Sequence, residues 1–110
     1  MAKFVKGDIV VVPFPFSDLT QSKRRPALVL ASLEGDDVIL CQITSKTMKD
    51  SYAIGIDEKD FVTGGLNQSS NVRPNRIFTA DNRIILYRAG SLKQEKLTEV
   101  VEKVIQIIKS

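Results

Sequence analysis

The sequence predicts a mainly β fold that ends in one helix, an α+β arrangement whose short strands form a strongly bent sheet or small barrel. Short β-branched runs alternate with glycine, proline and aspartate, and the only long helical pattern lies at the C-terminus. A chain of 110 residues can bury one core, and no repeat or linker divides it. We therefore expect a single domain covering residues 1–110.

The first strand is predicted at residues 9–12, an unbroken run of β-branched side chains that stops at Pro13. Residues 17–24 are polar, and we interpret them as a loop. A hairpin should follow, because residues 27–31 and 38–44 are apolar and the turn-forming residues 35–37 separate them.

The middle of the chain is less regular. Residues 52–56 are predicted as a short strand, and residues 61–70, which include two glycines, as a loop. Strands are expected again at residues 71–79 and 84–87, with room for a helical turn at residues 81–83 between them.

The C-terminal helix has the clearest pattern. Ser91 and Gln94 have the spacing of a capping box, which predicts that the helix starts there. Glu99 and Lys103 can form an ion pair one turn apart on its outer face. The apolar stripe that should face the core consists of Leu97, Val100, Val101, Val104, Ile105 and Ile108.

Composition excludes several kinds of chemistry. The chain has no histidine, which removes the usual general base, the imidazole triads and the commonest metal ligand. Cys41 is the only cysteine and lies in an apolar run, so we expect a small buried hydrophobe rather than a disulfide or zinc ligand. A formal net charge of +3 favours an anionic partner.

No targeting or membrane segment is predicted. The apolar run at residues 9–16 follows Asp8 and is broken by Pro13 and Pro15, so it fits neither a signal peptide nor a membrane span. We therefore expect a cytoplasmic protein with no membrane partner.

The first of three polar segments at predicted strand ends places Lys23, Arg24 and Arg25 before Pro26. Proline restricts the preceding residue to extended conformations, which fixes the direction of Arg25. Such a cluster can bind phosphate, although a solvated basic loop gives the same pattern.

The second segment ends the predicted strand at residues 38–44. Thr44, Ser45 and Lys46 offer two hydroxyls and a cation, groups that can bind a phosphate. In the alternative interpretation the hydroxyls cap a turn by accepting hydrogen bonds from nearby amides.

The third segment contains Arg73, Pro74, Asn75 and Arg76, a second arginine–proline pair among polar side chains. In the alternative interpretation it is a surface edge strand with solvated arginines, a position that suits proline.

In this order, the motifs resemble those of the MazF/PemK family of toxin endoribonucleases from bacterial type II toxin–antitoxin systems. The resemblance implies an SH3-like barrel of the CcdB/PemK type that forms a homodimer and cleaves single-stranded mRNA at short sequence motifs. It also implies inhibition by a cognate antitoxin protein. It covers nearly the whole chain and is carried by Gly7-Asp8, Arg25-Pro26-Ala27-Leu28-Val29-Leu30, Gln42-Ile43-Thr44-Ser45, Gly65-Leu66, Val72-Arg73, Thr79, Asp81 and Gly90-Ser91-Leu92.

The resemblance also assigns roles to residues. The catalytic arginine and threonine of the family match Arg25 and Thr44, and a further arginine of the PemK branch matches Arg73. Asn75 and Thr20 stand where many members carry acids, so the general base is unassigned. RNA binding is expected from Thr20, Lys23, Arg24, Ser45, Lys46, Asn75 and Arg76.

These residue types suit RNA cleavage without a metal ion or another cofactor. The 2′-hydroxyl of RNA can attack the adjacent phosphorus and leave a 2′,3′-cyclic phosphate, so the protein has only to align the phosphate and neutralise its charge. An arginine fork such as that of Arg25 matches this geometry. Two alternatives remain: a barrel that binds RNA or an antitoxin without cleavage, and a CcdB-like topoisomerase poison, which the absence of tryptophan disfavours.

Overall fold

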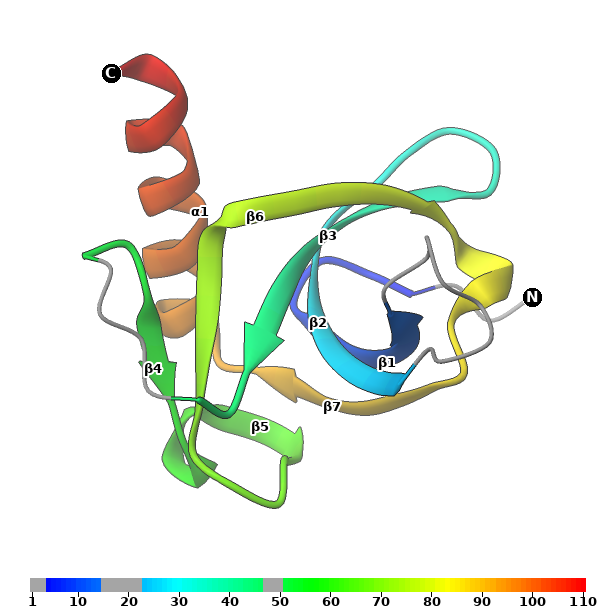
Figure 1. Ribbon diagram of the computed structural model, residues 1–110, viewed down its shortest axis with the longest axis horizontal. Coiled ribbons are helices and arrows are strands. Elements are labelled where there is room, and N and C mark those ends of the chain that lie inside the picture. The colour runs from blue at the N-terminus through cyan, green and yellow to red at the C-terminus, as the bar shows by residue number, and fades with distance from the viewer. Residues whose placement is uncertain (1–3, 15–22, 47–50) are drawn as a thin grey trace.

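A computed structural model describes residues 4–14, 23–46 and 51–110, so the predicted RNA-binding residue Thr20 lies outside the described residues. Most of the described chain is β-structure, and one long helix follows it (Figure 1). The elements are β1 (Asp8–Phe14), β2 (Lys23–Ser32), β3 (Asp37–Thr44), β4 (Ile54–Ile56), the 3-10 helix η1 (Glu58–Asp60), β5 (Phe61–Gly64), β6 (Ser70–Asp81), the 3-10 helix η2 (Asn82–Ile84), β7 (Tyr87–Leu92) and α1 (Gln94–Lys109).

The strands form one seven-stranded antiparallel sheet in the order β4-β6-β3-β2-β1-β7-β5. The sheet curls strongly, and its two edge strands, β4 and β5, follow one another in the chain through η1 (Figure 1). Strand curling of this kind brings the edges of a sheet towards each other, as in a half-barrel. The predicted mainly β fold with a terminal helix is confirmed.

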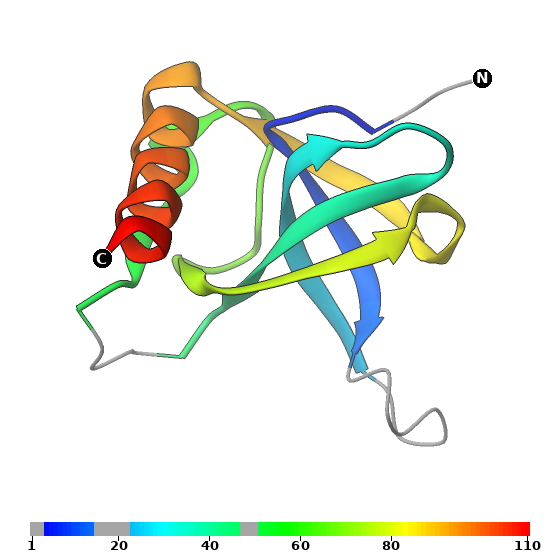
Figure 2. The same ribbon diagram turned by 90° about the horizontal axis from the view of Figure 1, so that it is seen from above.

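Two apolar clusters occupy opposite faces of the sheet. Alternation along β2 sends Leu28 and Leu30 to the cluster beneath α1, while Ala27 and Val29 belong to the second cluster. Figure 2 shows α1 on one side of the molecule, at the opposite end from η2. Both clusters are buried, so the middle strands carry apolar residues on both faces, which explains their continuous apolar runs.

Strand β6 turns a sharp corner in the middle (Figure 1). Val72 lies opposite Ile43 and Ile77 lies opposite Cys41, so residues 73–76 face only Gln42 on β3. Pro74 sits in this irregularity, where its missing amide donor interrupts no regular ladder, and it is buried. β6 as a whole lies between β4 and β3, but β4 pairs only with residues 70–72. The edge-strand interpretation is therefore wrong for the start of β6, whereas the pairing with β4 does not reach residues 73–76, where Asn75 and Arg76 are exposed.

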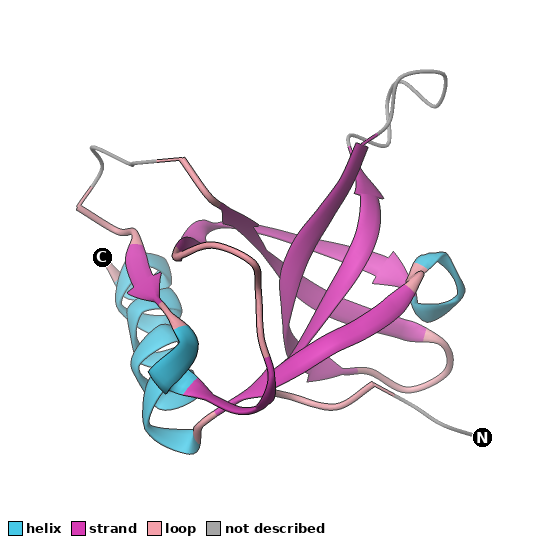
Figure 3. Cartoon of the chain, turned by 90° about the horizontal axis from the view of Figure 1, so that it is seen from below, coloured by secondary structure: helices cyan, strands magenta, loops and turns pink. Residues whose placement is uncertain are grey.

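Several predicted boundaries need correction. Residues 61–64 form β5 rather than loop, and the last predicted strand runs over 87–92 rather than 84–87. The basic residues Lys23 and Arg24 belong to β2 rather than to the preceding loop. The expected helical turn is present as η2, with Asp81 as its N-cap (Figure 3).

The predicted capping box of α1 is wrong. Ser91 lies in β7, where its Oγ is 3.2 Å from Oγ1 of Thr63 on β5. The helix begins at Gln94 behind Lys93, which makes no side-chain capping bond. Glu99 forms its ion pair with Lys96, at 3.1 Å, rather than with the predicted Lys103.

The apolar stripe of α1 is buried in its first turns only. Leu97 and Val100 belong to the core, and Val101 and Val104 pack against it. Ile105 and Ile108 are 48% and 68% exposed, so the prediction that they face the core is wrong.

Candidate nucleic-acid site

The sheet brings the first two polar segments together. Ala27 on β2 lies opposite Gln42 on β3, and continuing this register by two residues brings Arg25 level with Thr44. Cross-strand neighbours of this kind project from the same face of a sheet. The two predicted catalytic residues, which are 19 positions apart in the numbering, are therefore adjacent in the fold.

Arg25 and Thr44 line one surface cleft of about 320 Å³. The ends of β2 and β3 form one wall of this cleft, and the segment between β5 and β6 forms the other. None of the described residues that line it is acidic. They are Arg24, Arg25, Pro26, Ile43, Thr44, Ser45, Leu66, Asn67, Gln68 and Ser70.

The hydroxyl of Thr44 is already oriented. Thr44 is 8% exposed, and its Oγ1 accepts a hydrogen bond of 3.2 Å from the amide of Lys46. This is the turn-capping contact that the alternative interpretation of the segment predicted. It does not exclude ligand binding, because a hydroxyl that accepts one hydrogen bond can still donate its own proton.

Arg73 occupies the neighbouring strand. Thr44 lies opposite Asn71, and Arg73 is two residues further along β6, in a stretch where burial alternates regularly. Alternation therefore places Arg73 on the face that carries Thr44. Its backbone carbonyl accepts a hydrogen bond of 2.9 Å from Sγ of Cys41. Arg73 does not line the cleft of Arg25 and Thr44.

The remaining predicted binding residues surround this region to different degrees. Arg24 and Ser45 line the cleft, and Lys46 is exposed directly after Ser45. Lys23 is exposed at the start of β2. Asn75 and Arg76 are exposed at the corner of β6 and do not line the cleft.

The second wall of the cleft was not predicted as part of the site. Residues 66–68 were assigned to a loop and were not predicted to line the site, yet they line the cleft that contains Arg25. The signals for them are the Gly65-Leu66 pair, which is part of the resemblance, and the polar run that starts at Asn67. Nothing in that run indicates which strand ends it will face, because its position relative to β2 and β3 depends on the curl of the whole sheet.

Cys41 is fully buried, as predicted. Burial raises the pKa of its thiol from 9.0 to about 12, against a smaller lowering effect of a backbone hydrogen bond with Arg73. The thiol is therefore neutral at physiological pH and serves as a packed apolar group with one donor.

Asp81 and Arg83 form an exposed pair at η2, joined at 2.6 Å. Side-chain hydrogen bonds from Arg83 lower the pKa of Asp81 to about 2. Because neither residue lines the cleft, we assign this pair to the local structure of η2.

Two features are absent from the described residues. No group of three or more histidine, cysteine, aspartate or glutamate side chains is placed to hold a metal ion there. No helix in the same part of the chain is long and apolar enough to cross a membrane.

Comparisons with known proteins identify the family and the fold. A family model described as PemK-like, MazF-like toxin of type II toxin-antitoxin system matches residues 5–108. A search of curated proteins gives no match.

Solved structures share the fold. MazF (Form-I) from Deinococcus radiodurans is 21% identical, with 100% of both chains covered and a TM-score of 0.74. MazE-MazF (Form-II) from the same organism is 20% identical, with 98% of this chain and 97% of that chain covered and a TM-score of 0.73. An endoribonuclease in complex with its cognate antitoxin from Mycobacterial species is 12% identical, with 99% of this chain and 96% of that chain covered and a TM-score of 0.73.

Proposed function

The chain belongs to the PemK-like, MazF-like toxins of type II toxin–antitoxin systems, and we propose that it is an endoribonuclease that cleaves single-stranded RNA without a metal ion. The observation that carries this proposal is the cleft in which Arg25 and Thr44 meet. It combines a guanidinium, an oriented hydroxyl and a second cation, Arg24, with no acidic side chain among its described lining residues. Such a surface suits one phosphate of a polyanion.

In the proposed reaction the RNA supplies its own nucleophile. The 2′-oxygen forms a bond to the adjacent phosphorus, and the bond from phosphorus to the 5′-oxygen breaks. The 2′-proton leaves to solvent, and the departing 5′-oxygen gains a proton. The products are a 2′,3′-cyclic phosphate and a 5′-hydroxyl, and the balance requires no redox partner or activated water.

The protein's part is to hold the phosphate in line and to stabilise the charge that builds on its oxygens. Arg25 can bind two phosphoryl oxygens through its planar fork. Thr44 can donate its hydroxyl proton to one of these oxygens, since Lys46 already occupies an acceptor direction of Oγ1. Arg73 adds a second guanidinium on the same face of the sheet.

The exposed cations would guide the strand to this point. Lys23, Arg24, Lys46 and Arg76 can bind backbone phosphates, which gives affinity with little sequence preference. Ser45 and Asn75 would add polar contacts to the sugar–phosphate chain. The proposal also includes the predicted contact of Thr20 with RNA.

Partners follow from the family. Solved relatives include MazE-MazF complexes and an endoribonuclease bound to its cognate antitoxin. We infer that this chain acts in the cytoplasm on mRNA, forms a homodimer and is restrained by an antitoxin protein of its own.

A chelator assay tests the proposal. Purified protein is incubated with a long single-stranded RNA in EDTA, and the new ends are mapped. We expect discrete fragments with 2′,3′-cyclic phosphate and 5′-hydroxyl termini. RNA that stays intact in EDTA but is cut when Mg²⁺ is added would contradict metal independence. RNA that stays intact under both conditions would favour the alternatives, a non-cleaving RNA- or antitoxin-binding barrel or a CcdB-like poison.

A further inference from the structure

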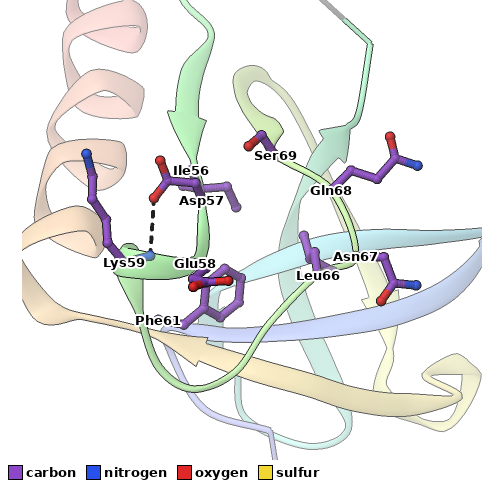
Figure 4. Close-up of a pocket in the computed structure, with 9 residues that line it drawn as sticks. All are labelled: Ile56, Asp57, Glu58, Lys59, Phe61, Leu66, Asn67, Gln68 and Ser69. Carbon is purple, nitrogen blue, oxygen red and sulfur yellow. Dashed lines mark hydrogen bonds between the residues drawn. The ribbon is translucent and has the colours of Figure 1, made fainter.

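A second hollow of about 470 Å³ adjoins the cleft, because residues 66–68 line both of them. Its opposite wall is η1 together with the ends of β4 and β5 that flank it. In Figure 4 the side chain of Leu66 points towards η1, whereas those of Asn67 and Gln68 point away from it. The hollow and the cleft are thus neighbours along one segment of chain.

The hollow has an apolar interior and a polar rim. Ile56, Phe61 and Leu66 line it, and the first two are 3% and 8% exposed, so they form its fixed base. Asp57 and Glu58 line it as well. This pairing of apolar surface with a few polar groups is typical of a site for a small organic group.

Glu58 is a rim group that is available to a ligand. It is exposed, and within the described part of the chain its carboxylate makes no hydrogen bond or ion pair. Its position is nevertheless fixed by a capping box. Oδ1 of Asp57 accepts from the amide of Lys59 at 3.2 Å, and the amide of Asp57 donates to Oδ2 of Asp60 at 3.0 Å.

We propose that this hollow binds a nucleobase that flanks the scissile phosphate, and that Glu58 selects guanine there. This inference rests on the proposed ribonuclease function. Bases of single-stranded RNA are recognised by contact of their flat faces with apolar or aromatic side chains and by hydrogen bonds to their polar edges. The hollow offers both kinds of contact next to the cleft of Arg25 and Thr44.

Guanine fits the carboxylate best. Its Watson–Crick edge carries two adjacent donors, the N1–H and the N2 amino group, which match the two oxygens of one carboxylate. Adenine and cytosine each present one amino donor beside an acceptor nitrogen, and uracil presents one N–H between two carbonyls. Glu58 therefore makes two hydrogen bonds with guanine and at most one with any other base.

The charges divide in the way such a complex needs. Arg24 and Arg25 line the cleft, whereas two carboxylates, Asp57 and Glu58, and one cation, Lys59, line the hollow. The cleft lining is therefore positively charged and the hollow lining carries a net negative charge, which favours a strand whose backbone lies over the cleft and whose uncharged base enters the hollow.

The test pairs a protein variant with a change in the RNA. Cleavage sites are first mapped on a random-sequence RNA pool, which identifies any position near the cut where guanine is preferred. Two oligonucleotides are then compared, one with guanosine at that position and one with inosine, which lacks the N2 amino group. We expect the unmodified protein to cleave the guanosine substrate about 10-fold faster and Glu58→Gln to cleave both at similar rates.

Two controls make the outcome specific. Glu102→Gln removes an exposed carboxylate from α1 and should keep the full preference for guanosine. The same oligonucleotides with a 2′-deoxy sugar at the cleavage position cannot be cut, so their binding can be measured by fluorescence anisotropy. In this assay Glu58→Gln should also lose the discrimination between guanosine and inosine.

The inference and the proposed function fail in different ways. If the unmodified protein cuts RNA but the pool shows no guanine preference, or if Glu58→Gln keeps the guanosine preference, the nucleobase site is wrong and the ribonuclease assignment stands. If the unmodified protein cuts no RNA at all, the proposed function itself is wrong.

Discussion

The amide of Lys46 donates a hydrogen bond of 3.2 Å to Oγ1 of Thr44, in the cleft that Thr44 shares with Arg25. The contact fixes one acceptor direction of the hydroxyl and leaves its proton to point towards a ligand. A residue that closes a turn can therefore also serve as a donor in the site.

This geometry predicts opposite results for two substitutions of Thr44. Thr44→Ser retains the hydroxyl and should keep most of the cleavage activity, whereas Thr44→Val keeps the shape but removes the donor. By analogy with other preorganised donors, we expect Thr44→Val to lower the single-turnover cleavage rate by roughly 100-fold. Melting curves of the two variants serve as the folding control. Equal activity of both would exclude a hydroxyl contact to the phosphate.

Substitution of Arg25 should slow cleavage more strongly than it weakens RNA binding. Arg25→Ala removes the fork that stabilises charge in the transition state, and a loss on the order of 100-fold or more in rate is expected. Arg25→Lys keeps the charge but not the two-point contact, so its cleavage rate should lie between those of the unmodified protein and Arg25→Ala. Arg83→Ala, which removes an exposed arginine paired with Asp81 at η2, is the matched control. Similar losses at Arg25 and Arg83 would argue for a general charge effect.

Lys46 should contribute to affinity through simple charge attraction. For single strands, the plot of log affinity against log salt has a negative slope, and each lost phosphate contact makes it shallower by about 0.7. We expect Lys46→Ala to show this change equally for RNAs of different sequence, measured by anisotropy with an uncleavable RNA at several salt concentrations. Lys109→Ala at the far end of α1 should leave the slope unaltered. A sequence-dependent effect of Lys46→Ala would instead indicate a base contact.

The close approach of β5 and β7 predicts a stability effect at Gly90. A Cβ at Gly90 would lie 2.5 Å from the carbonyl oxygen of Thr63, whereas a Cβ at Gly35 would meet nothing within 4 Å. Gly90→Ala should therefore lower the free energy of unfolding by about 1–3 kcal/mol, the usual cost of overpacking. Gly35→Ala, whose φ of 78° carries its own strain, is the comparison. Denaturant unfolding of both variants measures the difference, and a milder effect at Gly90 than at Gly35 would contradict the close spacing of these two strands.

Cys41 supplies a prediction on pH and reactivity. Burial raises its pKa to about 12 in the folded protein, against 9.0 in its ordinary state. The unfolded chain therefore releases this proton first as the pH rises, so this group's contribution to folding is complete below about pH 9 and declines between about pH 9 and pH 12. At neutral pH the folded protein should resist thiol alkylation that the denatured protein undergoes, as mass spectrometry can show. Rapid alkylation of the folded protein would contradict the buried position.

The predicted fold and the observed one agree where the signal is local. The β-branched run at residues 9–12 and the hairpin around residues 35–37 appear as expected because burial on both faces and turn chemistry are properties of short segments. Ser91 was misassigned because a serine followed by Gln94 satisfies a helix cap locally, while pairing of β7 with β5 extends the strand past it. That pairing depends on residues almost thirty positions away, which no local pattern reveals.

The candidate site was predictable in part for the same reason. Arg25 and Thr44 each follow a distinct local motif, and the register of β2 with β3 then sets them side by side. The wall formed by residues 66–68 and the hollow beyond it arise only when the curled sheet brings the two edge strands together. Glu58 likewise has no sequence pattern that distinguishes it from any other surface glutamate.

Arg25 lies opposite Val12 on β1, and Thr44 lies opposite Asn71 on β6, so both residues belong to the backbone ladder at the centre of the molecule. Side chains anchored in this way are displaced only when the central strands themselves separate. Loss of activity on heating should consequently follow the same curve as melting of the sheet, with no temperature at which the protein is still folded but already inactive.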